Sequence, residues 1–426
     1  MKKYFLAVAS FFIYSHISLG QVYPGQMDST FVPVRSHHYD PELTFDFCVN
    51  EPAWSNQAGI HSAFGSTDRL YFRKEVPVNH DNDLSSSYST AVWRGERANA
   101  QILVWSSEAL EQVRVSTQDL RSAEGNIIPK DRITFELVRY VLSNYPYAEK
   151  KAICGESPYK SGFLMPDRFE TLGRFDLPSQ TTRPVWMMVD VPRGTAPGTY
   201  KGKVEVRAKG KAPQLLNLEI VVQNQLLPYP KDWKYRLDLW QNPWAVAWYN
   251  HVEPWSPEHK MLLKQHLKHY ADAGGTYITT YGVHSPWSDN SYMIEGGMIE
   301  WIKKADGTWA FDYKIFDEYV ELAMECGIDE AITLYTPIPW GFRHRYKDEA
   351  TGDYSYINWA PSSEEFKKMW NIFLTDFKFH LEAKSWLDIT YIGINENPME
   401  ETLAAINVVR NHDKCWKITY AGNWHK

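Results

Sequence analysis

The pattern of predicted strands and helices changes at one point in the chain, the segment Leu227–Pro230, and this change limits what the chain can fold into. Before it, short apolar runs are separated by turns that contain proline and glycine; after it, predicted strands and helices alternate. The first pattern is typical of antiparallel sheets, and the second of parallel strands joined by helical crossovers. The sequence therefore predicts a multidomain protein of β and α/β classes, with a linker near residue 230.

Residues 21–230 are predicted to form a β-sandwich domain. Strands are expected at Arg97–Trp105, Pro184–Val191, Tyr200–Arg207 and Leu215–Gln223, with a turn at Gly194–Thr199. Short strands at this spacing favour two antiparallel sheets packed face to face.

Residues 231–426 are predicted to form part of a (β/α)8 barrel of the TIM type. Strands are expected at Trp233–Trp240, Thr276–Val283, Asp329–Tyr335, Asp388–Glu396 and Trp416–Ala421. Helices are expected between them at Pro257–Ala273, Phe311–Cys326, Ser363–Ala383 and Met399–Asn411, with Ser256 as an entry signal and Gly327 as a stop signal. Since a complete barrel has eight strands, we expect this barrel to be truncated after about five of them.

The first 20 residues are predicted to be a cleavable signal peptide. Lys2 and Lys3 precede an apolar stretch, Phe5–Tyr14, and small residues follow at Ser18–Gly20. No cysteine follows the cleavage site, which argues against a lipid anchor, and no later segment is long and apolar enough to span a bilayer. We therefore expect an exported protein, periplasmic or secreted.

Charge and cysteine content exclude several classes of partner. The net charge is −7 without a basic cluster, so we expect no binding to nucleic acid. The four cysteines, Cys48, Cys154, Cys326 and Cys415, are widely spaced and form no metal-type pairs, so we expect no metal site and no cofactor. Cys48 and Cys154 either form a disulfide or remain free thiols.

Polar and aromatic residues gather at the ends of the predicted barrel strands. The chain has 18 Trp and 26 Tyr, which serve either a large core or a carbohydrate surface, since these rings combine an apolar face with a polar tip. The carboxyl ends of barrel strands converge on one face, and a sugar needs polar groups between aromatic rings. The candidate sugar-binding residues are Asp238, Trp240, Asn242, His284, Trp287, Trp340 and Asn423. Taken singly, each fits ordinary packing as well as binding, and only their convergence favours a site.

Glu396 is the candidate general acid. It lies in the run Ile394–Glu400, directly after an apolar strand and before a predicted helix. A carboxyl among aromatic rings at a barrel mouth would be desolvated, which raises its pKa toward a useful range. The alternative is a salt bridge or a carboxylate that stabilises the start of the next helix. Its neighbour is Asn395, where a mechanism with two carboxylates would need an aspartate.

Several short motifs give the chain a resemblance to a known family. In the second domain they are Leu237–Pro243, Ala271–Gly274, Asp306–Trp309, Phe311–Tyr313, Thr390–Ile392, Pro398–Glu400 and Ile418–Asn423. In the first domain they are Trp93–Arg97 and Thr182–Trp186. With these motifs the chain resembles glycoside hydrolase family 123 and its Bacteroidetes relatives of unknown function.

The resemblance implies an exported enzyme that removes β-linked N-acetylgalactosamine or a related N-acetylhexosamine from a glycan. Members of that family use a neighbouring Asp-Glu pair: the Glu is the acid/base, and the Asp holds the acetamido group of the substrate, whose carbonyl oxygen is the nucleophile. The resemblance places Glu396 in the first role and Asn395 in the second. An amide brings no negative charge to the oxazolinium ion that forms.

Two other hypotheses remain because of Asn395 and the incomplete barrel. The chain is then either a glycan-binding protein with impaired catalysis or the remnant of a longer gene product.

Overall fold

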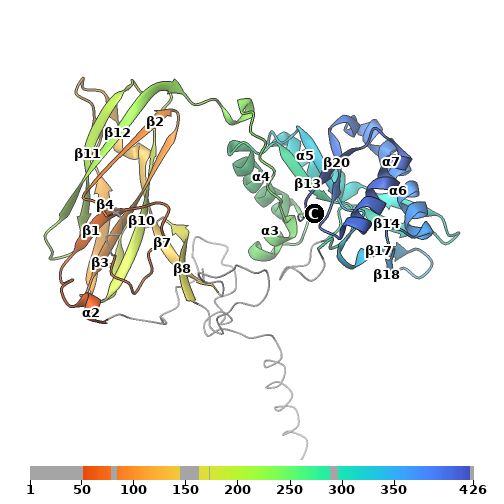
Figure 1. The fold of residues 1–426 in the computed structure, drawn as a ribbon, viewed down its shortest axis with the longest axis horizontal. Coiled ribbons are helices and arrows are strands. Elements are labelled where there is room, and N and C mark those ends of the chain that lie inside the picture. Colours follow the sequence, from red (N-terminus) through yellow and green to blue (C-terminus); the bar gives the residue numbers. More distant parts are fainter. Residues whose placement is uncertain (1–50, 78–83, 144–162, 172, 288–295, 423–426) are drawn as a thin grey trace, which may run out of the picture. The chain divides into compact units, whose positions relative to one another are not determined.

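The computed structural model describes residues 51–77, 84–143, 163–171, 173–287 and 296–422 of the 426-residue chain (Figure 1). The chain separates into two compact units, with the division between Leu227 and Pro228. The predicted signal peptide, Cys48, Cys154 and the candidate sugar ligand Asn423 lie outside the described residues.

Two β-sheets that share one core make up the first unit (Figure 1). The five-stranded sheet runs in the order β1 (His61–Gly65), β3 (Arg97–Ser106), β10 (Thr181–Asp190), β7 (Ile133–Ser143) and β8 (Phe163–Glu170). The seven-stranded sheet runs in the order β2 (Ser87–Arg94), β12 (Gln214–Leu226), β11 (Gly198–Arg207), β4 (Leu110–Thr117) and β9 (Phe175–Leu177), with β5 (Leu120–Arg121) and β6 (Ile127–Ile128) beside β11. Each of the four strand runs expected in this part of the sequence lies in, or overlaps, one of these strands.

Alternation of side chains along the strands explains how this unit buries its core. In β12, Leu216, Leu218, Ile220 and Val222 are buried, while the residues between them are not. A strand with period two places one set of side chains against the facing sheet and the other toward solvent.

The second unit contains an open parallel sheet of four strands. Its order is β13 (Tyr277–Tyr281), β16 (Ala331–Tyr335), β19 (Thr390–Ile394) and β20 (Lys417–Tyr420), and every neighbouring pair is parallel. The helices of this unit are α3 (Pro243–Asn250), α4 (Pro257–Asp272), α5 (Lys314–Glu325), α6 (Glu364–Lys384) and α7 (Met399–His412). All five residues of β16 are buried, as expected for a parallel strand that is covered on both faces.

The predicted barrel differs from the structure at its first strand. Trp233–Trp240 forms no strand; within it only Leu237 pairs, in an isolated parallel bridge with Gly275. Most residues of this segment are exposed, so it lacks the buried side chains that hold a central strand. Among the described residues the sheet stays open, with no closed barrel.

A second sheet in this unit was not predicted from the sequence. Its strands are β15 (Trp309–Asp312), β14 (Glu300–Lys303), β17 (Arg343–Asp348) and β18 (Tyr354–Asn358), in that order. The helix expected to begin at Phe311 therefore begins at Lys314, whose backbone N–H is held by the Asp312 side chain at 2.8 Å. The sequence signal for this sheet is the Asp306–Gly307 pair in the β14–β15 turn, where Gly307 has a φ of 84°.

Serine caps fix the starts of two long helices. The Ser256 hydroxyl accepts the backbone N–H of His259 at 3.2 Å, and the Ser363 hydroxyl accepts that of Phe366 at 3.1 Å. Such caps satisfy backbone donors that have no partner inside the helix. The predicted entry through Ser256 is confirmed. No helix in the described part of the chain has the length and apolar character to span a membrane.

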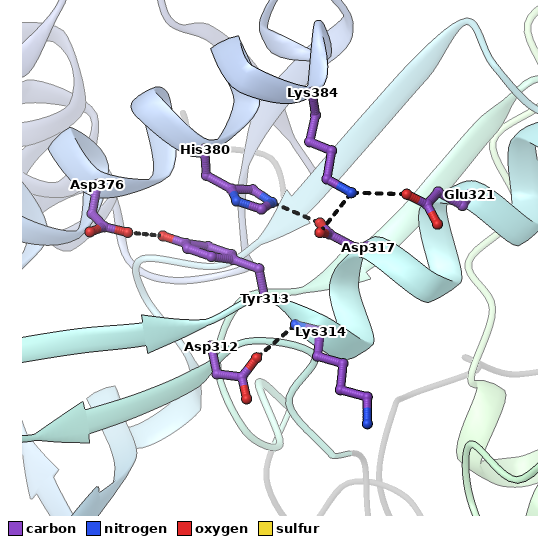
Figure 2. Close-up of polar contacts among 8 residues, drawn as sticks. All are labelled: Asp312, Tyr313, Lys314, Asp317, Glu321, Asp376, His380 and Lys384. Atoms are coloured by element: carbon purple, nitrogen blue, oxygen red, sulfur yellow. Dashed lines mark hydrogen bonds and ion pairs between the residues drawn. The ribbon is translucent and has the colours of Figure 1, made fainter.

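Polar contacts fasten α5 to α6 (Figure 2). Asp317 of α5 lies 2.7 Å from His380 Nε2 and 2.9 Å from Lys384 Nζ, both on α6. The Tyr313 hydroxyl donates to Asp376 at 2.7 Å, and the Tyr313 ring stacks on His380 at 4.0 Å. All these groups have hydrogen-bond or ion-pair partners within the protein, so we interpret the cluster as a structural one that stabilises the packing of α5 on α6.

Trp301 of β14 is the centre of an aromatic core that joins the second sheet to α6. It is 2% exposed, stacks on Phe373 at 4.8 Å and lies 5.5 Å from Trp370. His344 is buried in the same core, where its Nδ1 lies 3.0 Å from the Phe342 carbonyl oxygen and its Nε2 accepts the Trp370 indole N–H at 3.3 Å. Nδ1 therefore carries the hydrogen, and His344 is neutral.

We expect the protein to lose stability as the pH falls from about 6.5 toward about 4, because burial lowers the pKa of His344 to about 4. The unfolded chain takes up this proton at the higher pH, so unfolding is favoured throughout the interval, by about 3 kcal/mol once it is complete. Urea unfolding at pH 7 and at pH 5 measures the effect. His344→Asn keeps an amide donor near Nδ1 without a titrating group and should show a shallower pH slope; equal slopes would contradict this role for His344.

Candidate active site

Three aromatic rings meet at the carboxyl ends of the parallel strands. Trp240 precedes α3, Trp287 follows β13, and Tyr335 is the last residue of β16. The Trp240 ring centroid lies 4.9 Å from that of Trp287 and 4.9 Å from that of Tyr335, and the last two lie 5.4 Å apart. Trp240 is 46% exposed whereas Trp287 and Tyr335 are buried, so Trp240 is the ring that offers a face to solvent.

Asn395 follows β19 and connects this cluster to the strand end. It is 1% exposed, and its Oδ1 accepts two hydrogen bonds, from Trp287 Nε1 at 2.8 Å and from the Glu396 backbone N–H at 2.7 Å. Its Nδ2 donates to the Pro286 carbonyl oxygen at 3.4 Å. The two N–H donors fix which end of the amide is the oxygen, because a flipped amide would oppose donor to donor. Oδ1 therefore accepts two hydrogen bonds from the protein, and Nδ2 is the atom of this side chain that can still bond to another group.

Glu396 lies beside Asn395 with an exposed side chain. The desolvation expected from surrounding aromatic rings is therefore absent from this conformation. Asn397 then donates from Nδ2 to the Ile338 carbonyl oxygen at 2.9 Å, and Pro398 leads into α7. The backbone on both sides of Glu396 is thus held by side-chain hydrogen bonds, and its carboxyl projects from a fixed position.

Pro286 joins three strand ends. Its carbonyl oxygen accepts the Trp340 backbone N–H at 2.8 Å as well as the Asn395 amide. The loops after β13 and β16 and the end of β19 therefore meet at one atom. This junction brings Trp287, Trp340 and Asn395 together, as the convergence of strand ends predicts.

Of the predicted polar ligands Asp238 and Asn242, the first lies beside the aromatic cluster and the second caps a helix. Partial burial raises the pKa of Asp238, although the residue keeps contact with solvent. The pKa of Tyr335 is also raised, first by burial and then by the nearby negative charge of Asp238. Asp238 is thus beside the aromatic cluster. The Asn242 oxygen accepts the Ala245 backbone N–H at 3.2 Å and caps α3, which gives it a structural role.

His284 belongs to the same loop as Trp287 but lines a cavity that neither Asn395 nor Glu396 reaches. Burial, followed by the charges of Arg345 and Arg343, lowers the pKa of His284 to about 4. Arg345 Nη1 lies 3.5 Å from His284 Nε2. Tyr335 and Arg345 were not among the predicted site residues. Tyr335 could have been predicted from its position at the end of a strand. Arg345 could not, because it lies in the sheet that the sequence did not predict.

Within the described residues, no group of three histidine, cysteine, aspartate or glutamate side chains is placed to hold a metal ion. The groups that the structure describes at the strand ends are the exposed carboxyls of Glu396 and Asp238, a fixed amide and aromatic faces. Such a set suits proton transfer to or from a sugar.

Comparison with known proteins identifies both units. A family model described as "Glycoside hydrolase 123, catalytic domain" matches residues 240–426, and one described as "Glycoside hydrolase 123 N-terminal domain" matches residues 64–208. A family 123 glycoside hydrolase from Clostridium perfringens, whose structural analysis concerns glycolipid glycan hydrolysis, is similar with a TM-score of 0.76 and 26% identity. The similarity covers 86% of this chain and 64% of that chain.

A family 39 glycoside hydrolase from Bacteroides cellulosilyticus matches with a TM-score of only 0.22 and 13% identity, over 72% of this chain and 48% of that chain, and supports no argument. Among curated protein sequences, none matches. The two family models together cover more than half of the chain. The chain therefore belongs to glycoside hydrolase family 123.

Proposed function

We propose that this protein is an exported glycoside hydrolase that removes β-linked N-acetylhexosamine, such as N-acetylgalactosamine, from glycans, with Glu396 as the acid/base. The observation that carries the proposal is the exposed carboxyl of Glu396 at the end of a parallel strand, beside an aromatic cluster. Family membership and the similarity to an enzyme of glycolipid glycan hydrolysis support it. The order β13-β16-β19-β20 also supports a further proposal, that this sheet is an arc of a (β/α) barrel.

The proposed mechanism uses the substrate's own acetamido group and retains the anomeric configuration. Glu396 donates a proton to the glycosidic oxygen while the acetamido carbonyl oxygen attacks the anomeric carbon, so that the glycosidic bond breaks and an oxazolinium ion forms. Glu396, now a carboxylate, takes a proton from a water molecule. That water opens the oxazolinium ring and leaves the sugar with its original configuration.

A second candidate function, glycan binding with impaired catalysis, is favoured by the orientation of Asn395. Both hydrogen bonds to its Oδ1 come from within the protein. The side chain therefore offers no free oxygen to an acetamido N–H and no charge to an oxazolinium ion. Loss of one electrostatic contribution of this kind lowers rates by about 100- to 1,000-fold.

Hydrolysis of a chromogenic β-N-acetylgalactosaminide, measured beside equilibrium binding of N-acetylgalactosamine, separates the two functions. We expect release of the chromophore that follows enzyme concentration. Binding of the sugar without any release would contradict the proposed hydrolase and leave the binding function.

Asn395→Asp is expected to raise kcat/KM on N-acetylated substrates by up to about 100-fold. One carboxylate oxygen keeps the bonds from Trp287 and Glu396, and the other replaces Nδ2 and offers an acceptor with negative charge. The cost is the contact to Pro286, now oxygen against oxygen. The matched control is Asn397→Asp, the same change two residues away. An equal gain on a substrate without the acetamido group would contradict the proposed role of this position.

A further inference from the structure

The second sheet of this unit ends in an edge strand, β15, which is paired on one side with β14. In the turn between these strands the Lys304 backbone N–H donates to the Thr308 carbonyl oxygen at 2.8 Å, which makes the two residues a hydrogen-bonded pair. Such pairs recur at every second residue of an antiparallel ladder, so Ala310 also bonds to β14. Trp309 and Phe311 lie between the bonded positions and direct their N–H and C=O groups away from the sheet. Among the described residues these four groups have no partner, so the edge is a template for another strand.

A groove of about 800 Å³ lies beside this edge, between β15 and α6. Its wall consists of residues from 309–313 and 371–383, and neither range is next to an undescribed segment in the sequence. Phe379 of α6, in this wall, is 77% exposed, the largest exposed fraction among the large apolar side chains of the described residues. Unpaired strand backbone beside an exposed apolar side chain fits a partner that is itself a β-strand.

The polar side chains of the groove already have partners within the protein. Thr375 Oγ1 donates to the Asn371 carbonyl oxygen at 2.8 Å, and Asp376 accepts the Tyr313 hydroxyl at 2.7 Å (Figure 2). His380 stacks on the Tyr313 ring and bonds to α5. A sugar needs side-chain donors and acceptors and gains little here, whereas a strand brings its own backbone groups and apolar side chains.

We propose that a second copy of this chain occupies the groove, by antiparallel pairing of β15 with β15 of that copy about a two-fold axis at Ala310. The spacing of the outward backbone groups determines this choice of partner. The axis sets Trp309 of each copy opposite Phe311 of the other, so the outward groups of both copies are bonded at once in four hydrogen bonds. The pairing joins two four-stranded sheets into one of eight strands and removes the β15 edge of each.

The charges in this register are compatible with the pairing. Asp312 lies opposite Thr308 of the other copy, so no like charges face each other on the strands. Beyond the strands, Lys314 at the start of α5 lies near the Asp306 turn of the other copy, which brings opposite charges together at both ends. On the side of α6 the second copy covers Phe379.

Sedimentation equilibrium of the full-length protein over a range of concentrations tests the proposal, and we expect a monomer–dimer equilibrium. Ala310→Lys places two like charges against each other on the axis and should weaken association at least about tenfold. Phe379→Ser removes the exposed ring, should weaken association by a similar factor, and tests the interface even if the lysine variant does not fold. The matched control is Met261→Ser, at a position of α4 that is 57% exposed, and it should leave association unchanged.

Ala310→Cys, made together with Cys415→Ser, tests the register. The axis places the two new thiols in a non-hydrogen-bonded pair, whose Cα atoms lie about 4.5 Å apart, within the range of a disulfide. We expect mild oxidation to join two copies through position 310, which mass spectrometry of the linked peptides identifies. Thr308→Cys in the same background should form no such link, because position 308 lies opposite position 312.

The pairing does not depend on the proposed function, so a protein without hydrolase activity should associate in the same way. A monomer at every concentration, including one that binds an extended peptide in the groove instead, would overturn the proposal. A dimer that Ala310→Lys and Phe379→Ser leave unchanged, or equal cross-linking through positions 308 and 310, would also overturn it.

Discussion

Replacing Glu396 by glutamine is expected to lower hydrolysis of an unactivated β-N-acetylgalactosaminide by about 100- to 10,000-fold, the usual contribution of a positioned acid/base. Glutamine keeps the shape of the side chain and removes its ionisable proton. A natural sugar leaving group must be protonated as it departs, whereas a nitrophenolate departs without help. The loss should therefore be much smaller in the first chemical step with a nitrophenyl glycoside. Rates on both substrates, measured under single turnover, provide the comparison.

The matched control for this variant is Glu400→Gln. Glu400 is also an exposed carboxylate, and it lies in the first turn of α7. Its replacement should change activity little. The assignment of Glu396 is wrong if Glu396→Gln hydrolyses the unactivated glycan as fast as the parent protein, or if both variants lose activity equally.

The second large effect is expected from Trp301→Ala, which should destabilise the second unit by about 3–5 kcal/mol. The indole is buried among aromatic rings, and its Nε1 donates to the Gly282 carbonyl oxygen at 2.9 Å. Removing it leaves a cavity and an unpaired carbonyl. Trp301→Phe retains much of the packing and loses the hydrogen bond, so a smaller cost is expected. Urea unfolding followed by far-UV circular dichroism measures both.

Trp248→Ala is the control for a tryptophan of the same unit that is about half exposed. Its stability should stay close to that of the parent, since surface substitutions usually change stability by about 0.5 kcal/mol or less. Equal destabilisation by Trp301→Ala and Trp248→Ala would show that the core around β14 does not carry the stability of this unit.

The long regular elements could be predicted from the sequence because their signals are local. Ser256 and Ser363 cap helices whose apolar positions repeat with helical spacing, and the parallel strands are short apolar runs between them. The sheet of β15, β14, β17 and β18 was not predicted because most of its side chains are at least partly exposed, so its strands lack the continuous buried apolar runs of β13, β16 and β19. The segment Trp233–Trp240 was wrongly predicted as a strand, because most of its residues are exposed and it lacks the burial that a central parallel strand requires.

The candidate site was predictable only as a set of strand ends. Convergence brought Trp240, Trp287 and Asn395 together, yet the bond from Trp287 to Asn395 joins residues 108 positions apart, and no local pattern encodes it. Asn242 was assigned to sugar binding from its position alone, while its side chain caps a helix. The direction in which the side chains of a short loop point cannot be predicted from the sequence either. In this loop His284 lines the cavity, whereas Trp287 bonds to Asn395.

That loop has a consequence for the effect of substitutions within it. His284 faces the cavity and Trp287 holds Asn395, with only two residues between them, and the Gly282 carbonyl at the start of the loop is bonded to Trp301. A substitution that shifts the backbone of this short loop would therefore disturb two hydrogen bonds at once, the one that orients Asn395 in the candidate site and the one that pairs the Trp301 indole in the aromatic core.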